Sequence, residues 1–316
     1  MNTVKKINFL FLFSVILSVA GSAFVSLLAT KSLKIGIITN IIVSQGFILV
    51  PGLLFVLLNN GKENGIKFGK LKITTVLMMI IYTELCMPLA TAANVFSQLF
   101  TKNEVVGMSG EILDMPFWLM ALTIGVFGPV CEEFVFRGII FQGLRSATGR
   151  IIASVVLSAV FFGLMHLNLN QFCYALVLGL IFAITDEALG GLWPSIIMHT
   201  IINVQNVAML YLSKWALKLA GQSDIKSAYD ATLSNNIILF MSGFFFVMAV
   251  ITVALAILLL MGMCQNEGRM EYLKNIFRKN DAREKVLTVS GIIGITICLF
   301  VIFALGPVTN LISKYL

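Results

Sequence analysis

Apolar stretches close to the length of a membrane span recur along the whole sequence. A transmembrane helix needs about 20 consecutive, mostly apolar residues. Nine stretches approach or exceed that length: 7–29, 36–58, 73–99, 115–136, 151–167, 172–188, 190–213, 236–263 and 287–312. Only 12% of the residues are charged, whereas a soluble domain has about 25%. We therefore expect a polytopic membrane protein with about eight or nine transmembrane helices.

The positions of Lys and Arg predict the orientation of these spans. Positive residues favour the cytoplasmic side, and most of them fall there if the N-terminus is cytoplasmic; the basic 264–286 segment is the strongest indication. The first stretch follows Lys5 and Lys6 but is too long for an ordinary signal peptide, so we expect an uncleaved span. The net charge of +7 therefore indicates membrane topology and not nucleic-acid binding.

The spans suggest one membrane domain, 1–316. Within it we interpret 1–72 as additional N-terminal spans, 73–263 as the core, and 264–316 as a basic cytoplasmic loop with a C-terminal span. The five cysteines show no paired spacing, so we expect neither a disulfide framework nor a CxxC metal site.

Three charged residues, Glu132, Glu133 and Arg137, interrupt the apolar run from Pro116 to Phe141. Each costs roughly 2.5–3.5 kcal/mol on membrane-insertion scales, so such groups are expected to face a protein interior or a wet cavity. Pro129 removes a backbone donor just before them and can open the helix into a pocket. In that setting Glu132 suits general-base chemistry near neutral pH. The alternative is an ordinary helix end at the headgroup boundary.

The other acidic residues have structural or solvated interpretations. Glu133 and Arg137 lie four positions apart with the acid first, which is the spacing of an ion pair on one helix face. Glu84 either faces the same cavity or pairs with Arg137. Asp186 and Glu187 fall at the end of a predicted span and are expected to be in water.

The two histidines of the chain also lie in apolar segments. Phe162 and His166 are four positions apart, and so are His199 and Asn203. His199 and Asn203 offer hydrogen-bond donors on one helix face, which suits the stabilisation of developing negative charge. The alternative for these residues is interhelical hydrogen bonding that only holds the bundle together.

Glu132, His166, His199 and Asn203 together fit attack of water on an acyl group. Glu132 would take the proton, His166 would orient the water or share the base role, and His199 with Asn203 would stabilise the oxyanion. No Gly-x-Ser-x-Gly or His-Glu-x-x-His motif is present. We expect no metal or other cofactor; the alternative is a zinc site made by Glu132, His166 and His199 with one open position.

The span boundaries leave one conflict in this set. If the fourth span ends near Phe136, Glu132 lies near the inner face, whereas His166 lies near the outer end of the fifth span. Extension of the fourth helix to about Leu144 would bring Glu132 to mid-depth. His166 would still need a tilted or shifted fifth helix.

Three motifs resemble those of the CAAX protease and bacteriocin-processing (CPBP or Abi) family of intramembrane glutamate-type endopeptidases. They are Glu132-Glu133-x-x-x-Arg137, Phe162-x-x-x-His166 and His199-x-x-x-Asn203, and they lie within roughly 115–210. The resemblance implies an all-α bundle that encloses an intramembrane catalytic cavity. It also implies that Glu132 is the catalytic glutamate with His166 as its partner, that His199 and Asn203 form the oxyanion site, and that Glu133, Arg137 and Phe162 support them.

These observations favour an endopeptidase that cleaves a membrane-associated peptide or protein, such as a CAAX-like lipidated protein or a bacteriocin or leader peptide. The expected location is the bacterial cytoplasmic membrane, with the N-terminus cytoplasmic and the lipid bilayer as the surroundings. One alternative is a non-catalytic bacteriocin self-immunity or scaffold protein that binds a partner through the same cavity. Another is a transporter that uses the buried charges as a proton relay.

Overall fold

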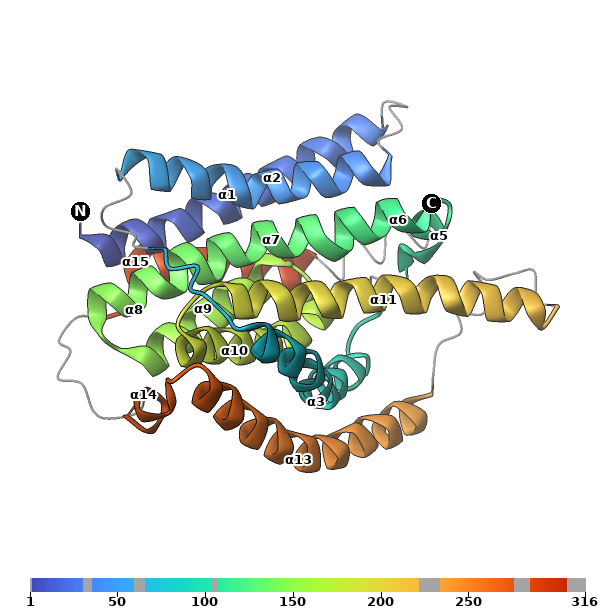
Figure 1. Cartoon of the computed structure of the whole chain (residues 1–316). Helices are drawn as coiled ribbons and strands as arrows, with labels where there is room; N and C mark the ends of the chain where they lie inside the picture. Colours follow the sequence, from blue (N-terminus) through green and yellow to red (C-terminus); the bar gives the residue numbers. More distant parts are fainter. Residues whose placement is uncertain are drawn as a thin grey trace.

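The computed structural model describes residues 2–30, 36–59, 66–103, 107–221, 234–275 and 285–305. These residues form helices and turns, with no strand among them. Figure 1 shows most of the long helices running side by side along one direction, with α1 and α2 on one side of the bundle and α13 on the other. This arrangement confirms the all-α fold.

Seven helices are long and apolar enough to cross a membrane. They are α1 (Thr3–Thr30), α2 (Ile37–Leu58), α3 (Ile73–Ser97), a compound helix (Phe117–Thr148), α10 (Leu169–Leu189), α11 (Trp193–Leu219) and α13 (Asn235–Asn266). Two apolar helices are shorter: α9 (Ile151–Met165) and α15 (Val289–Phe300), which continues as the π-helix η3 (Val301–Leu305). The predicted span 287–312 continues beyond the described residues. The remaining described helices, α5 (Ser109–Leu113) and α14 (Met270–Asn275), are single turns or little more.

The compound helix carries the first motif near its middle. Its parts are α6 (Phe117–Met120), η1 (Ala121–Phe127), α7 (Gly128–Glu133), η2 (Phe134–Phe141) and α8 (Gln142–Thr148), of which η1 and η2 are π-helical. π-Helical turns are rare in proteins, and those that occur often lie at functional sites. The predicted end near Phe136 is wrong, because the helix continues to Thr148 and stops at Gly149, whose left-handed φ of 68° ends it.

The extended compound helix and α9 together resolve the conflict over depth. Helix α9 ends at Met165, and His166 is its C-terminal cap. Glu132 and His166 are equally far along the chain from Gly149, which corresponds to roughly 25 Å along each helix at 1.5 Å per residue. The continuation of the compound helix to Thr148 therefore brings Glu132 level with His166.

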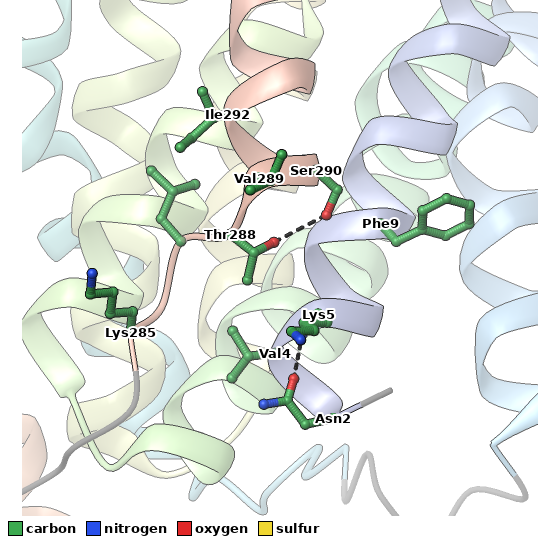
Figure 2. Close-up of a pocket in the computed structure, with 10 residues that line it drawn as sticks. Asn2, Val4, Lys5, Phe9, Lys285, Thr288, Val289, Ser290 and Ile292 are labelled. Atoms are coloured by element: carbon green, nitrogen blue, oxygen red, sulfur yellow. Dashed lines mark hydrogen bonds between the residues drawn. The ribbon is translucent and has the colours of Figure 1, made fainter.

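Helix packing places the motif residues inside the bundle, whereas a pocket lies away from them. The largest apolar core joins residues of α1, η2, α9 and α15, and includes a stacked pair, Phe11 and Phe161, with ring centroids 3.7 Å apart. A pocket of about 740 Å³ lies between the start of α1 and the start of α15, and Figure 2 shows the residues that line it. None of the residues that line this pocket belongs to the three motifs.

Candidate active site

Glu133 joins the first motif to the third. Its side chain is fully buried; Oε1 lies 2.7 Å from His199 Nδ1, and Oε2 lies 3.1 Å from Arg137 Nε. An ionised carboxylate only accepts hydrogen bonds, so Nδ1 of His199 carries a hydrogen and donates it. The expected ion pair between Glu133 and Arg137 is present. The second contact, to His199 on α11, was not predicted.

Glu132 faces the other nitrogen of the same imidazole ring. Its Oε2 lies 3.9 Å from His199 Nε2, which is too long for a direct hydrogen bond. Its Oε1 accepts a hydrogen bond of 2.8 Å from Gln45 Nε2 on α2. The adjacent glutamates therefore lie near opposite edges of His199, one buried and one with 14% of its side chain exposed.

Phe162 lies between the charged residues and both histidines. The guanidinium carbon of Arg137 lies 4.1 Å from the centre of the Phe162 ring, in cation–π geometry. The same ring meets His166 and His199 edge-on, with ring centroids 5.2 and 5.8 Å away. Phe162 therefore supports Arg137 from one side and separates the two imidazoles.

His166 has one ring nitrogen fixed by the backbone. Its Nδ1 lies 3.0 Å from the carbonyl oxygen of Phe162, one turn earlier in α9. A carbonyl oxygen only accepts, so Nδ1 carries the proton and the neutral ring has its lone pair on Nε2. His166 is half-buried. The neutral ring can therefore accept a proton or a hydrogen bond at Nε2.

Asn203 connects α11 to the π-helical segment η1. Its Nδ2 donates a 3.1 Å hydrogen bond to the carbonyl oxygen of Ile124. Gly125 permits this close approach, since a Cβ there would lie 2.6 Å from a methyl carbon of Val204. The side-chain amide has two N–H groups, and one of them is used here. The interhelical bond is thus present, and the oxyanion role stays a prediction.

The motif residues fall within a segment that also matches known proteins. Residues 114–205 match the profile of a family described as "Type II CAAX prenyl endopeptidase Rce1-like". This segment of the chain is therefore similar to the CAAX prenyl endopeptidase family. A curated relative, "Putative membrane peptidase YdiL" of Bacillus subtilis (strain 168), is 32% identical over 91 residues. That match covers 29% of this chain and 37% of the relative. No solved structure matches significantly.

The zinc alternative would need Glu132, His166 and His199 to converge on one point. Among the residues that the structure describes, no three His, Cys, Asp or Glu side chains are placed to hold a metal ion. We therefore derive no step through a metal.

Sequence reasoning missed Gln45, which contacts the predicted base. Gln45 lies on α2, outside the segment that matches the family and among the spans interpreted as additions. A glutamine in an apolar run was the available signal, because amides in lipid normally find a partner. Its Oε1 is buried and has no hydrogen-bond partner within the described part of the chain.

The solvated interpretation of Asp186 and Glu187 is wrong. Asp186 is 3% exposed and Glu187 is 8% exposed. Glu187 accepts hydrogen bonds from Arg145 Nε and from the Tyr272 hydroxyl group. The two residues are hidden because α11 and α14 fold back over the end of α10, which a span boundary in the sequence does not reveal.

Glu84 does not pair with Arg137. It is exposed, and its Oε2 accepts a hydrogen bond of 3.4 Å from Gln205 Nε2 on α11.

Proposed function

We propose that this protein is an intramembrane peptidase that hydrolyses a peptide bond of a membrane-associated substrate by means of a water molecule activated by Glu132. The observation that supports this most is the placement of Glu132 and Glu133 beside opposite nitrogens of His199. An ion pair with His199 that only stabilised the fold would need one of the two glutamates, not both. The second acid, Glu132, is partly exposed, and its Oε2 lies 3.9 Å from His199 Nε2. One water molecule can bridge this gap.

Glu132 is the general base in this mechanism. It takes a proton from the water, whose oxygen attacks the carbonyl carbon of the scissile bond. The protonated glutamate then returns the proton to the leaving amine nitrogen as the C–N bond breaks. A general base of this kind contributes typically about 10²–10⁴-fold to the rate. Gln45 fixes one oxygen of Glu132, so that the other is directed toward His199.

His199 and Asn203 would stabilise the tetrahedral intermediate. In its doubly protonated form His199 can donate from Nε2, while Glu133 holds Nδ1 and balances the charge. The second N–H of the Asn203 amide is the other donor. His166 would orient the water with the lone pair on Nε2.

The proposed substrate is a lipid-anchored or hydrophobic peptide, either CAAX-like or a bacteriocin or leader peptide. The name of the matched family supports prenylated CAAX proteins, and the name of the relative supports a membrane location. The proposed site of action is the bacterial cytoplasmic membrane, with the N-terminus in the cytoplasm. The alternative is a non-catalytic immunity or scaffold protein.

Cleavage assays with purified protein in liposomes test the proposal. The wild type and the variants Glu132→Gln and His166→Ala would be incubated with lipidated and unlipidated peptide libraries, with and without a chelator. Glu187→Gln is the matched control, since it removes a buried acid outside the site. We expect wild-type and control cleavage, and at least ~10²-fold losses in the other two variants.

Three results would contradict parts of this proposal. Cleavage that survives Glu132→Gln would exclude Glu132 as the base. Loss of cleavage with the chelator would point to a metal in place of glutamate-activated water. A biological activity in the host that survives both variants would favour the non-catalytic alternative.

A further inference from the structure

We infer that Asp186 is a positioning residue of the active site, which acts through Arg137 on the contact between Glu133 and His199. The consequence for catalysis rests on the proposed function. The consequence for His199 can be measured without any substrate.

Asp186 is a buried carboxylate with one oxygen unused. Its Oδ1 accepts a 2.8 Å hydrogen bond from the backbone N–H of Ser195, while Oδ2 has no hydrogen-bond partner among the described residues. A buried charge without compensation is strongly destabilising. A buried carboxyl group of this kind is therefore either neutral or close to a cation.

Arg137 is that cation. It interacts electrostatically with both Glu133 and Asp186. It is fully buried, and neither of its terminal nitrogens has a hydrogen-bond partner in the described ranges. Helix α10, which carries Asp186, packs directly on the guanidinium group: a Cβ at Gly179 would lie 3.2 Å from Nη2, and the Phe182 ring centre is 5.3 Å from Cζ. One guanidinium group therefore interacts with two buried carboxyl groups and with the partly exposed Glu132.

This sharing connects Asp186 to the imidazole. Oε2 of Glu133 contacts Arg137, and Oε1 contacts His199. A change in the electrostatic interaction between Arg137 and Glu133 therefore also changes the interaction between Glu133 and His199. Without the Asp186 charge, Arg137 would interact with Glu133 and with Glu132 only. The electrostatic environment at His199 Nδ1 would change, although no atom of Asp186 is recorded in contact with His199.

A purely structural role for Asp186 is the competing explanation. Its hydrogen bond to Ser195 caps the first turn of α11, one turn before His199. Asparagine caps helices about as well as aspartate does. Asp186→Asn therefore keeps the cap and removes the charge, whereas Asp186→Ala removes both.

The first measurement uses the fact that the chain has only two histidines. Full-length protein labelled with ¹⁵N-histidine would be reconstituted in detergent micelles, and the two rings would be assigned with His166→Gln. We expect Asp186→Asn to shift the ring-nitrogen resonances of His199 and to leave those of His166 in place. Glu187→Gln, which changes the neighbouring acid, should move neither ring.

The second measurement is cleavage by the same variants. We expect Asp186→Asn to lower kcat about tenfold or more, the loss typical when a residue that orients a functional histidine is removed, with KM unchanged. Glu187→Gln should retain wild-type kcat.

The two measurements separate this inference from the proposed function. His199 resonances that stay within one line width in Asp186→Asn would overturn the inference whatever the activity. A shift of the His199 resonances and a loss of kcat that occur only in Asp186→Ala would also overturn the inference, since the helix cap alone would then explain the effect of Asp186. If the wild type cleaves nothing while Asp186→Asn shifts His199, the inference stands and the peptidase proposal fails.

Discussion

Gln45 donates a 2.8 Å hydrogen bond from Nε2 to Oε1 of Glu132, although the two residues are 87 positions apart in the sequence. The contact joins α2 to the first motif. The family match begins at residue 114, so part of the candidate site comes from a helix outside the matched segment.

Replacing Gln45 with Leu should lower peptidase activity about tenfold, because a hydrogen bond to a charged group is worth roughly 1.5–3 kcal/mol. Ser44→Ala is the control on the same helix, since Ser44 bonds only its own helix at Ile41 among the described contacts. Steady-state cleavage rates would show the difference. Equal rates for the two variants would mean that the contact with Glu132 has no role in the reaction.

Removing the charge of Glu133 should destabilise the fold. Glu133→Gln leaves Arg137 buried without its closest acid, and breaking such a pair costs about 3–5 kcal/mol. The double variant Glu133→Gln with Arg137→Met should recover much of that stability and none of the activity. Thermal unfolding in detergent measures the first effect. A double variant less stable than the single one would argue against the buried pair as the cause.

Phe162 should matter for activity more than its neighbour Phe161. Both rings are buried, but only Phe162 contacts Arg137 and the histidines, whereas Phe161 stacks on Phe11. Phe162→Leu should lose about 0.5–2 kcal/mol of cation–π interaction and show a larger loss of kcat than Phe161→Leu. The comparison requires variants of similar melting temperature. If kcat falls equally in both, ring packing alone is responsible.

Asn203→Ala distinguishes an oxyanion donor from an interhelical bond. Loss of an oxyanion donor costs about 10²–10³-fold in kcat, whereas an interhelical bond in a membrane averages about 0.6 kcal/mol. We expect the larger effect on kcat, with only a small change in melting temperature. A variant with near-normal kcat would leave Asn203 with the bond to Ile124 alone.

Tyr272 provides a pH-dependent contact outside the spans. Burial, followed by its hydrogen bond to Glu187, raises the pKa of Tyr272 above its usual value of 10. The unfolded chain loses this proton at lower pH than the folded chain. The contact therefore stabilises the fold fully below pH 10, and this contribution is lost as the pH rises through the folded-state value. Ultraviolet titration of the wild type against Tyr272→Phe would detect a tyrosine that ionises late. If the absorbance difference between the wild type and Tyr272→Phe has its titration midpoint at pH 10, the prediction is contradicted.

The sequence predicted the helical fold and the ion pair between Glu133 and Arg137, because both depend on local patterns. Apolar stretches of fixed length indicate spans, and four-residue spacing places Glu133 beside Arg137 on one helix face. Those signals hold whatever the tertiary arrangement.

The errors concern features that depend on other helices. The fourth span was expected to end near Phe136, but the helix continues to Thr148, and its later part η2 packs against α9. The burial of Asp186 depends on α11 and Arg137, and the role of Gln45 depends on the packing of α2. Neither residue has a distinctive local pattern.

The ion pair between Glu133 and Arg137 has a consequence for biogenesis. Both residues lie on one helix, four positions apart, so they can neutralise each other while that helix enters the bilayer and before any other helix has docked. This reduces a transfer cost that would otherwise be roughly 2.5–3.5 kcal/mol for each charge. Asp186 and His199 come from later helices and meet the pair only during assembly. The order of synthesis thus delivers a pre-neutralised charge pair, around which the later helices complete the site.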